Sequence, residues 1–163
     1  MGVSGTGKTT VAAELAARCG ADLGEGDDFH PEANIAKMRS GQPLDDTDRQ
    51  PWLDALGEWL RRRYEANAGA VVTCSALKRA YRDRLRRDCP DAFFVHLDGP
   101  RDLIAQRLDG RRGHFFDPAL LDSQLAALEP LGPDEAGVVV DIGDDPAEIA
   151  RAAERAWRRF AEE

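Results

Sequence analysis

The 163-residue sequence lacks any long apolar run, and runs such as Ala70-Val71-Val72 are far too short to cross a bilayer. No segment near Met1 combines a basic start, an apolar stretch and a small-residue cleavage site, so we expect no signal peptide. The length suits one domain, and 42% hydrophobic and 32% charged residues are ordinary for a globular protein with a buried core. The composition therefore argues against a membrane-spanning or a wholly disordered protein.

Cysteine is scarce. The three cysteines, Cys19, Cys74 and Cys89, are odd in number and show no C-x-x-C spacing, which fits neither a disulfide framework nor a zinc site. We expect inert thiols in a reducing cytoplasm. Lysine is scarce as well, with three of the 22 basic residues, and two of them, Lys8 and Lys78, fall in the phosphate-binding and basic segments described below.

An excess of positive charge is also absent. The formal net charge is −8 and the sequence pI is about 4.9. Surfaces that bind nucleic acids or anionic membranes are basic. The charge therefore argues against both as partners.

Short β-branched or apolar runs alternate with helical periodicity along the chain. This alternation predicts a parallel sheet covered by helices on both sides, with ligands beyond the carboxyl ends of the strands. The candidate strands are Ala21–Leu23, Ala70–Thr73, Ala92–Leu97 and Gly137–Ile142.

Proline and aspartate mark the predicted starts of three helices. Pro51 is expected near the first turn of a helix with an apolar stripe from Trp52 to Tyr64. Asp117 and Pro118 begin a second helix, and Asp145-Pro146 repeats that signal for the last one.

The clearest motif is a phosphate-binding loop, G-x-x-x-x-G-K-[ST], which reads Gly2-Val3-Ser4-Gly5-Thr6-Gly7-Lys8-Thr9. Its glycines let backbone N–H groups turn toward phosphate oxygens, and the helix opening at Lys8 adds its positive end. We predict that Lys8 reaches the β- and γ-phosphates of ATP, that Thr9 binds Mg²⁺, and that Thr10 completes the nucleotide site. The motif alone leaves kinase, GTPase and ATPase open.

An acidic turn follows the first candidate strand. Carboxylates at the carboxyl end of a strand hold Mg²⁺ or accept the proton of an attacking hydroxyl, which makes Asp27 a candidate for both roles. The alternative is an acidic turn that caps the helix at Pro31. In that reading His30 is only a cap residue.

A basic segment follows the next strand. Lys78 and Arg82 are four residues apart and share one helix face, and an acidic protein that concentrates cations there is expected to bind an anion. The alternative is a solvated basic face balanced by Asp83 and Asp88.

Arginines and glycines alternate around residues 107–117. We interpret this segment as a lid whose residues Arg107 and Arg111 bring charge to the transferring phosphate and exclude water. A plain basic loop is the alternative.

Taken together, these residues resemble the gluconate kinase family of P-loop small-molecule kinases, from Gly2 to about Ile142. The phosphate-binding loop is unspecific, whereas the block from His30 to Leu53 and the pairing of residues 74–78 with residues 113–116 separate this family from shikimate and adenylate kinases. Besides the loop, the residues that carry the resemblance are Gly26-Asp27, His30-Pro31, Asn34-Ile35, Lys37-Met38, Ser40-Gly41-Gln42-Pro43-Leu44, Asp46, Asp48-Arg49, Pro51-Trp52-Leu53, Cys74-Ser75-Ala76-Leu77-Lys78, Tyr81-Arg82 and Gly113-His114-Phe115-Phe116.

The resemblance implies ATP- and Mg²⁺-dependent phosphorylation of D-gluconate to 6-phospho-D-gluconate, which feeds the pentose phosphate and Entner–Doudoroff routes. It implies a cytoplasmic homodimer. It also implies one domain over residues 1–163 with a three-layer α/β P-loop NTPase fold, like that of nucleoside monophosphate kinases, and parallel strands in the order 2-3-1-4-5. Another small-molecule P-loop kinase, such as a shikimate kinase, is the alternative.

The resemblance also assigns roles. Lys8, Asp27 and Arg111 would be catalytic, and Thr9 and Asp27 would hold the metal. Arg107 would contact the nucleotide. The residues expected to bind substrate are Asp27, His30, Lys78, Arg82 and His114.

One feature departs from the family pattern. A phosphate-binding loop follows a buried strand, yet only Met1 precedes Gly2. We expect the first, central strand to be missing or truncated, so that Met1 is not the natural start. Its two neighbours would then lack ladder partners.

Overall fold

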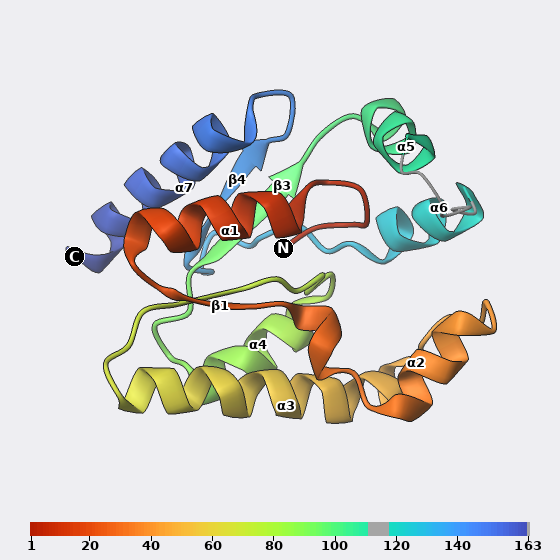
Figure 1. The fold of residues 1–163 in the computed structure, drawn as a ribbon, viewed down its shortest axis with the longest axis horizontal. Coiled ribbons are helices and arrows are strands. Elements are labelled where there is room, and N and C mark those ends of the chain that lie inside the picture. Colours follow the sequence, from red (N-terminus) through yellow and green to blue (C-terminus); the bar gives the residue numbers. More distant parts are fainter. Residues whose placement is uncertain (111–117, 163) are drawn as a thin grey trace.

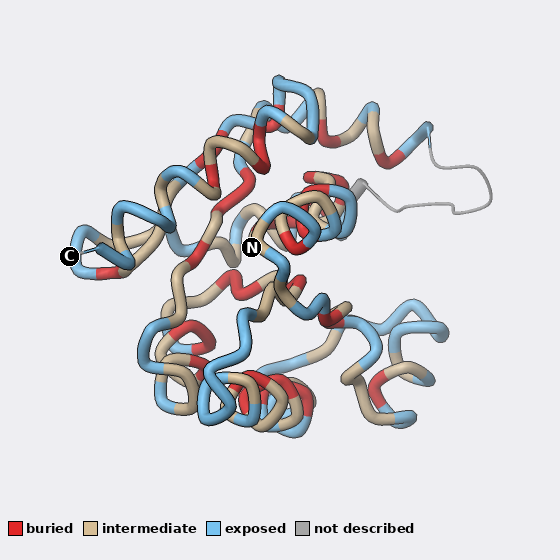
Figure 2. The backbone as a smooth tube through the Cα atoms, turned by 60° about the vertical axis from the view of Figure 1, so that its left-hand side comes forward, coloured by how far each residue is buried: buried red, intermediate tan, exposed pale blue. Residues whose placement is uncertain are grey.

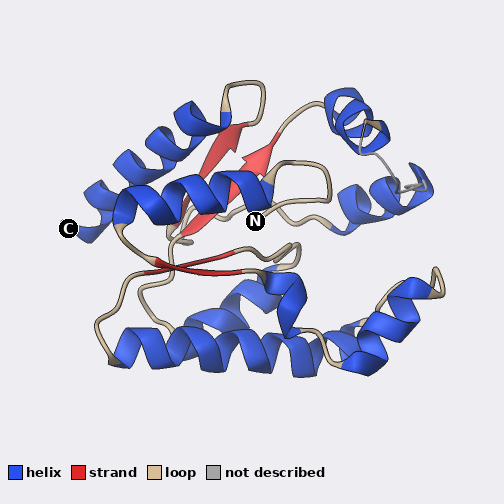
Figure 3. Cartoon of the chain, viewed as in Figure 1, coloured by secondary structure: helices blue, strands red, loops and turns tan. Residues whose placement is uncertain are grey.

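The computed structural model describes residues 1–110 and 118–162. Parallel strands lie between helical layers, with α1 and α7 packed together on one side and α3 and α4 on the other (Figures 1 and 3). The elements are α1 Lys8–Cys19, β1 Asp22–Gly24, a 3₁₀ helix η1 Gly26–Phe29, α2 Glu32–Arg39, α3 Asp46–Glu65, β2 Ala70–Val72, α4 Arg79–Asp88, β3 Phe94–Asp98, α5 Arg101–Asp109, α6 Pro118–Ala127, β4 Gly137–Asp141 and α7 Pro146–Ala161.

All four predicted strands are confirmed, with bounds within two residues of those expected. β1 pairs with β2 and β3 pairs with β4, both in parallel, and Leu23 lies opposite Val71 while Val95 lies opposite Val138. These two pairs match strands 2-3 and 4-5 of the expected order. In the described chain they form two separate two-stranded sheets.

The two sheets meet where the phosphate-binding loop begins. The amino group of Met1 donates to the carbonyl of Val95, and the carbonyl of Met1 accepts from the N–H of Leu97 at 3.0 Å. The N–H of Gly2 then donates to the carbonyl of Ser75 at 3.1 Å, beyond the end of β2. Met1 and Gly2 therefore link the β3 side of the molecule to the β2 side.

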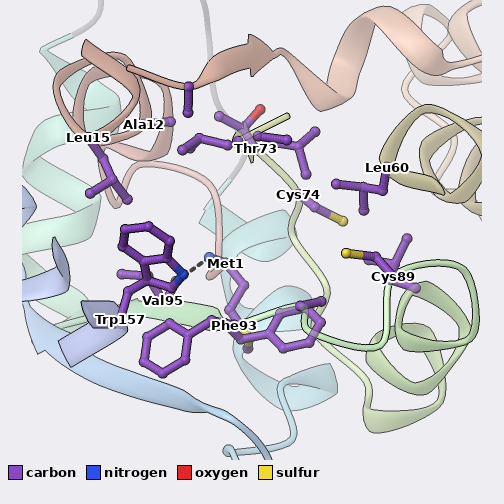
Figure 4. A pocket seen from close by; sticks show the side chains of 18 of the residues that line it. Met1, Ala12, Leu15, Leu60, Thr73, Cys74, Cys89, Phe93, Val95 and Trp157 are labelled. Carbon is purple, nitrogen blue, oxygen red and sulfur yellow. Dashed lines mark hydrogen bonds between the residues drawn. The ribbon is translucent and has the colours of Figure 1, made fainter. Parts of the chain in front are cut away.

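A cavity of about 300 Å³ lies beside this junction, between β2 and β3. Its lining is mostly apolar and comes from both strands, from α1 and from α7, with Leu15, Val95 and Trp157 among the side chains that face it (Figure 4). The cavity thus occupies the sheet position between β2 and β3, where the described residues supply only Met1.

Buried side chains form two cores, one for each sheet. Figure 2 marks the buried residues along the backbone. The first joins β3 and β4 to α1, α5, α6 and α7, with Leu97, Ile142 and Ile149 nearly inaccessible to solvent. The second packs α3 and α4 against the β2 side around Trp52 and Leu56. No helix in the described ranges is long and apolar enough to cross a membrane.

The helix starts were predicted with mixed success. Asp145 accepts from the N–H of Ala147 at 2.9 Å and caps α7, as expected. The expected position of Pro51 was wrong, because α3 begins at Asp46 and Pro51 lies inside it. Asp45 and Asp48 cap each other's backbone N–H groups at that end, which lets the helix start a turn earlier than the proline suggests. The α6 start at Pro118 is confirmed, while Asp117 lies outside the described residues.

Gly26 is where the acidic turn presses against β2. A Cβ at Gly26 would lie 2.0 Å from the carbonyl oxygen of Thr73, which is a backbone atom. We therefore expect Gly26→Ala to cost about 1–3 kcal/mol through overpacking and to lower Tm by about 3–10 °C in a thermal melt. The control is Gly110→Ala, where the described atom nearest to a Cβ, the carbonyl oxygen of Gln106, is 3.4 Å away and Tm should hardly move. An unchanged Tm for Gly26→Ala would contradict this packing.

Candidate active site

The phosphate-binding loop has the backbone that its glycines permit. Gly2, Gly5 and Gly7 have φ values of 133°, 86° and 88°, which side chains rarely adopt. Gly7 caps α1 without any side-chain hydrogen bond, so the positive end of the helix faces the loop. Thr9 and Thr10 lie exposed on the first turn of α1. The loop is therefore shaped for an anion.

Two side chains brace the loop from within. The ammonium of Lys8 and the hydroxyl of Thr6 both donate to the carbonyl of Val3, each at 2.9 Å. Thr6 is buried, whereas Lys8 is half-buried. Lys8 thus lies folded along the loop that it is predicted to serve.

Gln124 of α6 contacts the loop from the far side. Its carboxamide oxygen accepts from the N–H of Ser4 at 2.7 Å, and its nitrogen donates to the Ser4 hydroxyl at 3.1 Å. Sequence analysis missed this residue, because Gln124 belongs to no motif and is 120 positions away. It connects α6, the first element after the segment 111–117, directly to the phosphate-binding loop.

Arg107 lies close to the same loop, near the end of α5. A Cβ on Gly7 would lie 4.0 Å from its guanidinium, which donates to the carbonyl of Ile142 at 2.7 Å. Arg107 thus reaches the loop and the segment after β4, as a nucleotide contact requires. Arg111 and His114 lie outside the described residues, so their roles remain predictions.

The acidic turn is held rigidly at its base. The N–H of Gly26 donates to the hydroxyl of Thr73 at 2.9 Å, that hydroxyl donates to Glu25, and the indole of Trp52 donates to the carbonyl of Gly26 at 2.7 Å. Asp27 follows on η1 with an exposed side chain. The turn therefore presents the Asp27 carboxylate from a fixed backbone.

His30 is stacked against Trp52, with ring centroids 4.7 Å apart and planes 10° from parallel. Its Nδ1 lies 3.3 Å from the amide nitrogen of Asn34, which also donates to the carbonyl of Asp48 at 2.7 Å. Burial lowers the pKa of His30, while the charge of Asp27 opposes this shift. His30 is thus positioned by side-chain contacts beside Asp27 and is more than a helix cap.

Lys78 caps α4 and faces the start of α3. Its ammonium lies 2.8 and 2.9 Å from the two carboxylate oxygens of Asp46, which also accepts from the hydroxyl of Tyr81. The hydrogen bond from Asp46 raises the pKa of Lys78, and the one from Lys78 lowers that of Asp46. Both side chains are at least partly exposed, so the ammonium of Lys78 lies near the surface with its charge compensated.

Arg82 does not lie where a substrate contact requires. Its side chain is fully buried and forms an ion pair with Glu135, which is buried as well, at 2.7 and 2.8 Å. The guanidinium also donates to four backbone carbonyls, those of Ala76, Leu77, Glu129 and Pro130. The expected substrate role of Arg82 is therefore replaced by a structural one.

This buried pair lies where the loop before α4 meets residues 129–135. Glu129 donates its N–H to the carbonyl of Leu77 at 2.8 Å, and its carboxylate accepts from the N–H of Arg79. Arg86 adds a second cation to Glu135 at 3.2 Å. The segment that carries Lys78 is thus fixed against residues 129–135.

The described residues contain no group of three or more His, Cys, Asp or Glu side chains arranged to hold a metal ion. The Thr9 hydroxyl and the Asp27 carboxylate offer oxygen atoms of the kind that Mg²⁺ prefers.

Comparison with known proteins agrees with this geometry. The family described as "AAA domain" matches residues 1–131. A gluconokinase of Gluconobacter oxydans is 56% identical over 135 residues, covering 83% of this chain and 76% of the relative. The chain belongs to the gluconokinase family.

Two further members extend the likeness. The thermoresistant gluconokinase of Escherichia coli is 45% identical over 91% of this chain and 85% of its own. The crystal structure of a gluconokinase from Sinorhizobium meliloti superposes with a TM-score of 0.90 at 46% identity, covering 99% of this chain and 91% of the other. The gluconokinase fold thus extends over nearly all of the chain, which confirms the expected P-loop fold.

The buried pair generates a stability prediction. Glu135→Gln leaves the charge of Arg82 uncompensated, so we expect a loss of about 3–5 kcal/mol in unfolding free energy at pH 7. The control is Asp134→Asn, since the exposed pair of Asp134 with Arg79 should contribute at most about 1 kcal/mol. Chemical denaturation measures both, and equal losses would contradict the structural role.

The same pair predicts a pH dependence. The hydrogen bonds from Arg82 lower the pKa of Glu135 from 4.5 to about 2. Because the folded-state pKa lies below the unfolded one, the stabilisation is complete above pH 4.5 and is lost as the pH falls toward 2. Over this interval Tm should fall more steeply for the wild type than for Glu135→Gln.

Proposed function

We propose that the protein transfers the γ-phosphoryl group of ATP to D-gluconate and releases 6-phospho-D-gluconate and ADP. The observation that carries the proposal is that the phosphate-binding loop and the Asp27 turn both bond to the segment 73–75, which leads to the cationic start of α4. Membership of the gluconokinase family supports gluconate over shikimate as the acceptor.

Transfer of a phosphoryl group depends on positioning and charge neutralisation more than on covalent chemistry. The loop N–H groups and the end of α1 receive the phosphates, and Lys8 swings from the carbonyl of Val3 to the β- and γ-phosphates. Thr9 and Asp27 would hold Mg²⁺, which would neutralise phosphate charge when bound. Asp27 orients the acceptor hydroxyl and accepts its proton.

The remaining groups act around the two substrates. Arg107 contacts the nucleotide beside Gly7, and the lid residues Arg111 and His114 close over the transferring phosphate. His30 and Lys78 contact gluconate from η1 and α4. The working enzyme is proposed to be a cytoplasmic homodimer.

An ADP-release assay across acceptors tests this function. With ATP and Mg²⁺, gluconate should drive steady ADP release, while neutral glucose should be at least about 10²-fold poorer in kcat/KM, because a site built around a charge rejects an uncharged analogue. Gluconolactone and nucleoside monophosphates serve as controls. Release driven by shikimate would favour the alternative kinase, and release without any acceptor would indicate a nucleotide hydrolase.

Asp27→Asn tests the assigned base. The change removes the proton acceptor but keeps the size of the side chain, so kcat should fall by about 10²–10⁴-fold while the Kd for ATP stays within about threefold. Asp28→Asn is the matched control, since Asp28 is the exposed neighbour on the same short helix. A near-native kcat for Asp27→Asn would refute the assignment.

A further inference from the structure

The proposed substrate is an anion, so its acceptor site needs a cation that is not already committed. Lys78 is paired with Asp46, Lys37 is paired with Asp48, and Arg82 is buried on Glu135. These pairs leave the carboxylate of the acid without an obvious partner. Another cation on this side of the molecule is therefore required.

Arg49 of α3 meets that requirement. In the ranges 1–110 and 118–162, every other buried or half-buried arginine makes an ion pair or a side-chain hydrogen bond, whereas half-buried Arg49 makes neither. Its guanidinium lies over the ring of Tyr81, 5.9 Å from the centroid. Five N–H donors are thus held on an aromatic face without a carboxylate to receive them.

The position of Arg49 on α3 places it on the helix face that meets α4, where the acceptor is proposed to bind. It lies three residues after Asp46, so the two share the helix face that meets Lys78 and Tyr81. Burial lowers the pKa of His30, Asp27 opposes that shift and Arg49 reinforces it. Arg49 and the proposed base therefore act on the same imidazole.

The phosphate-binding loop reaches the end of β2, where the N–H of Gly2 donates to the carbonyl of Ser75 at 3.1 Å. Burial raises the pKa of the Cys74 thiol to about 11, while the N–H of Ala76 and the charges of Lys8 and Arg49 pull it down. Cys74 lies two residues beyond β2, and the charges of both cations act on its thiol. A linear acid between them would place its reacting hydroxyl toward Lys8 and its carboxylate toward Arg49.

We propose that Arg49 binds the carboxylate of the acceptor and sets the preference for sugar acids over neutral sugars. The inference rests on the proposed function. The planar guanidinium receives the carboxylate through two parallel hydrogen bonds, which a lysine in that place would not reproduce. Arg49 thereby also fixes which end of the acceptor faces the γ-phosphate.

The test compares D-gluconate with D-gluconamide, which has nearly the same shape but no charge. Arg49→Ala should raise the KM for gluconate by about 10- to 100-fold, with kcat and the KM for ATP within about threefold. Its preference for gluconate over gluconamide should fall to near unity. Arg49→Lys should keep part of the preference, and Arg87→Ala on the outer face of α4 should behave like the wild type.

Three results would overturn the inference. A wild-type KM and preference in Arg49→Ala would show that the carboxylate binds elsewhere. An equal loss with both acceptors would indicate a structural role for Arg49. If the wild type releases no ADP with gluconate, the proposed function fails and this inference fails with it, whereas the first two results leave the function intact.

Discussion

The charge of Arg82 has to be neutralised inside the protein, and much of the acceptor side is arranged around that requirement. An unpaired buried guanidinium would cost several kcal/mol. Glu135 supplies the opposite charge, and four carbonyls from the segments after β2 and before β4 complete the donor set. These bonds fix the position of the start of α4 relative to the segment before β4.

The cations of this acidic protein fall into groups with different surroundings, and Arg82 is an example of the buried group. Some are consumed within the fold, as Arg82 is, and some are balanced at the surface, as Lys78 is by Asp46. A few are proposed to act where two anionic substrates would meet, and these are Lys8, Arg49 and Arg107. A net charge of −8 is thus compatible with binding anions, because local arrangement outweighs the total.

Local patterns predicted what depends on neighbours in sequence. The glycine spacing predicted the phosphate-binding loop, the β-branched runs predicted four strands, and Asp145-Pro146 predicted the start of α7. Contacts between residues far apart in the sequence could not be predicted from local patterns. Helical spacing places Lys78 and Arg82 on one face but cannot reveal Glu135, 53 positions from Arg82, or Gln124, 120 positions from Ser4. Asp27 could be selected only through the family resemblance, because Asp28 has the same chemistry.

The start of the phosphate-binding loop has a structural role besides phosphate binding, because it connects the two sheets. Its first residues join β3 to the segment after β2, and each sheet has a core of its own. A nucleotide bound to this loop would therefore stabilise the connection between the two sheets. A ligand whose free concentration is 100 times its dissociation constant adds about 2.7 kcal/mol to the unfolding free energy of the protein that binds it. A rising ATP concentration would thereby raise the temperature at which this enzyme unfolds.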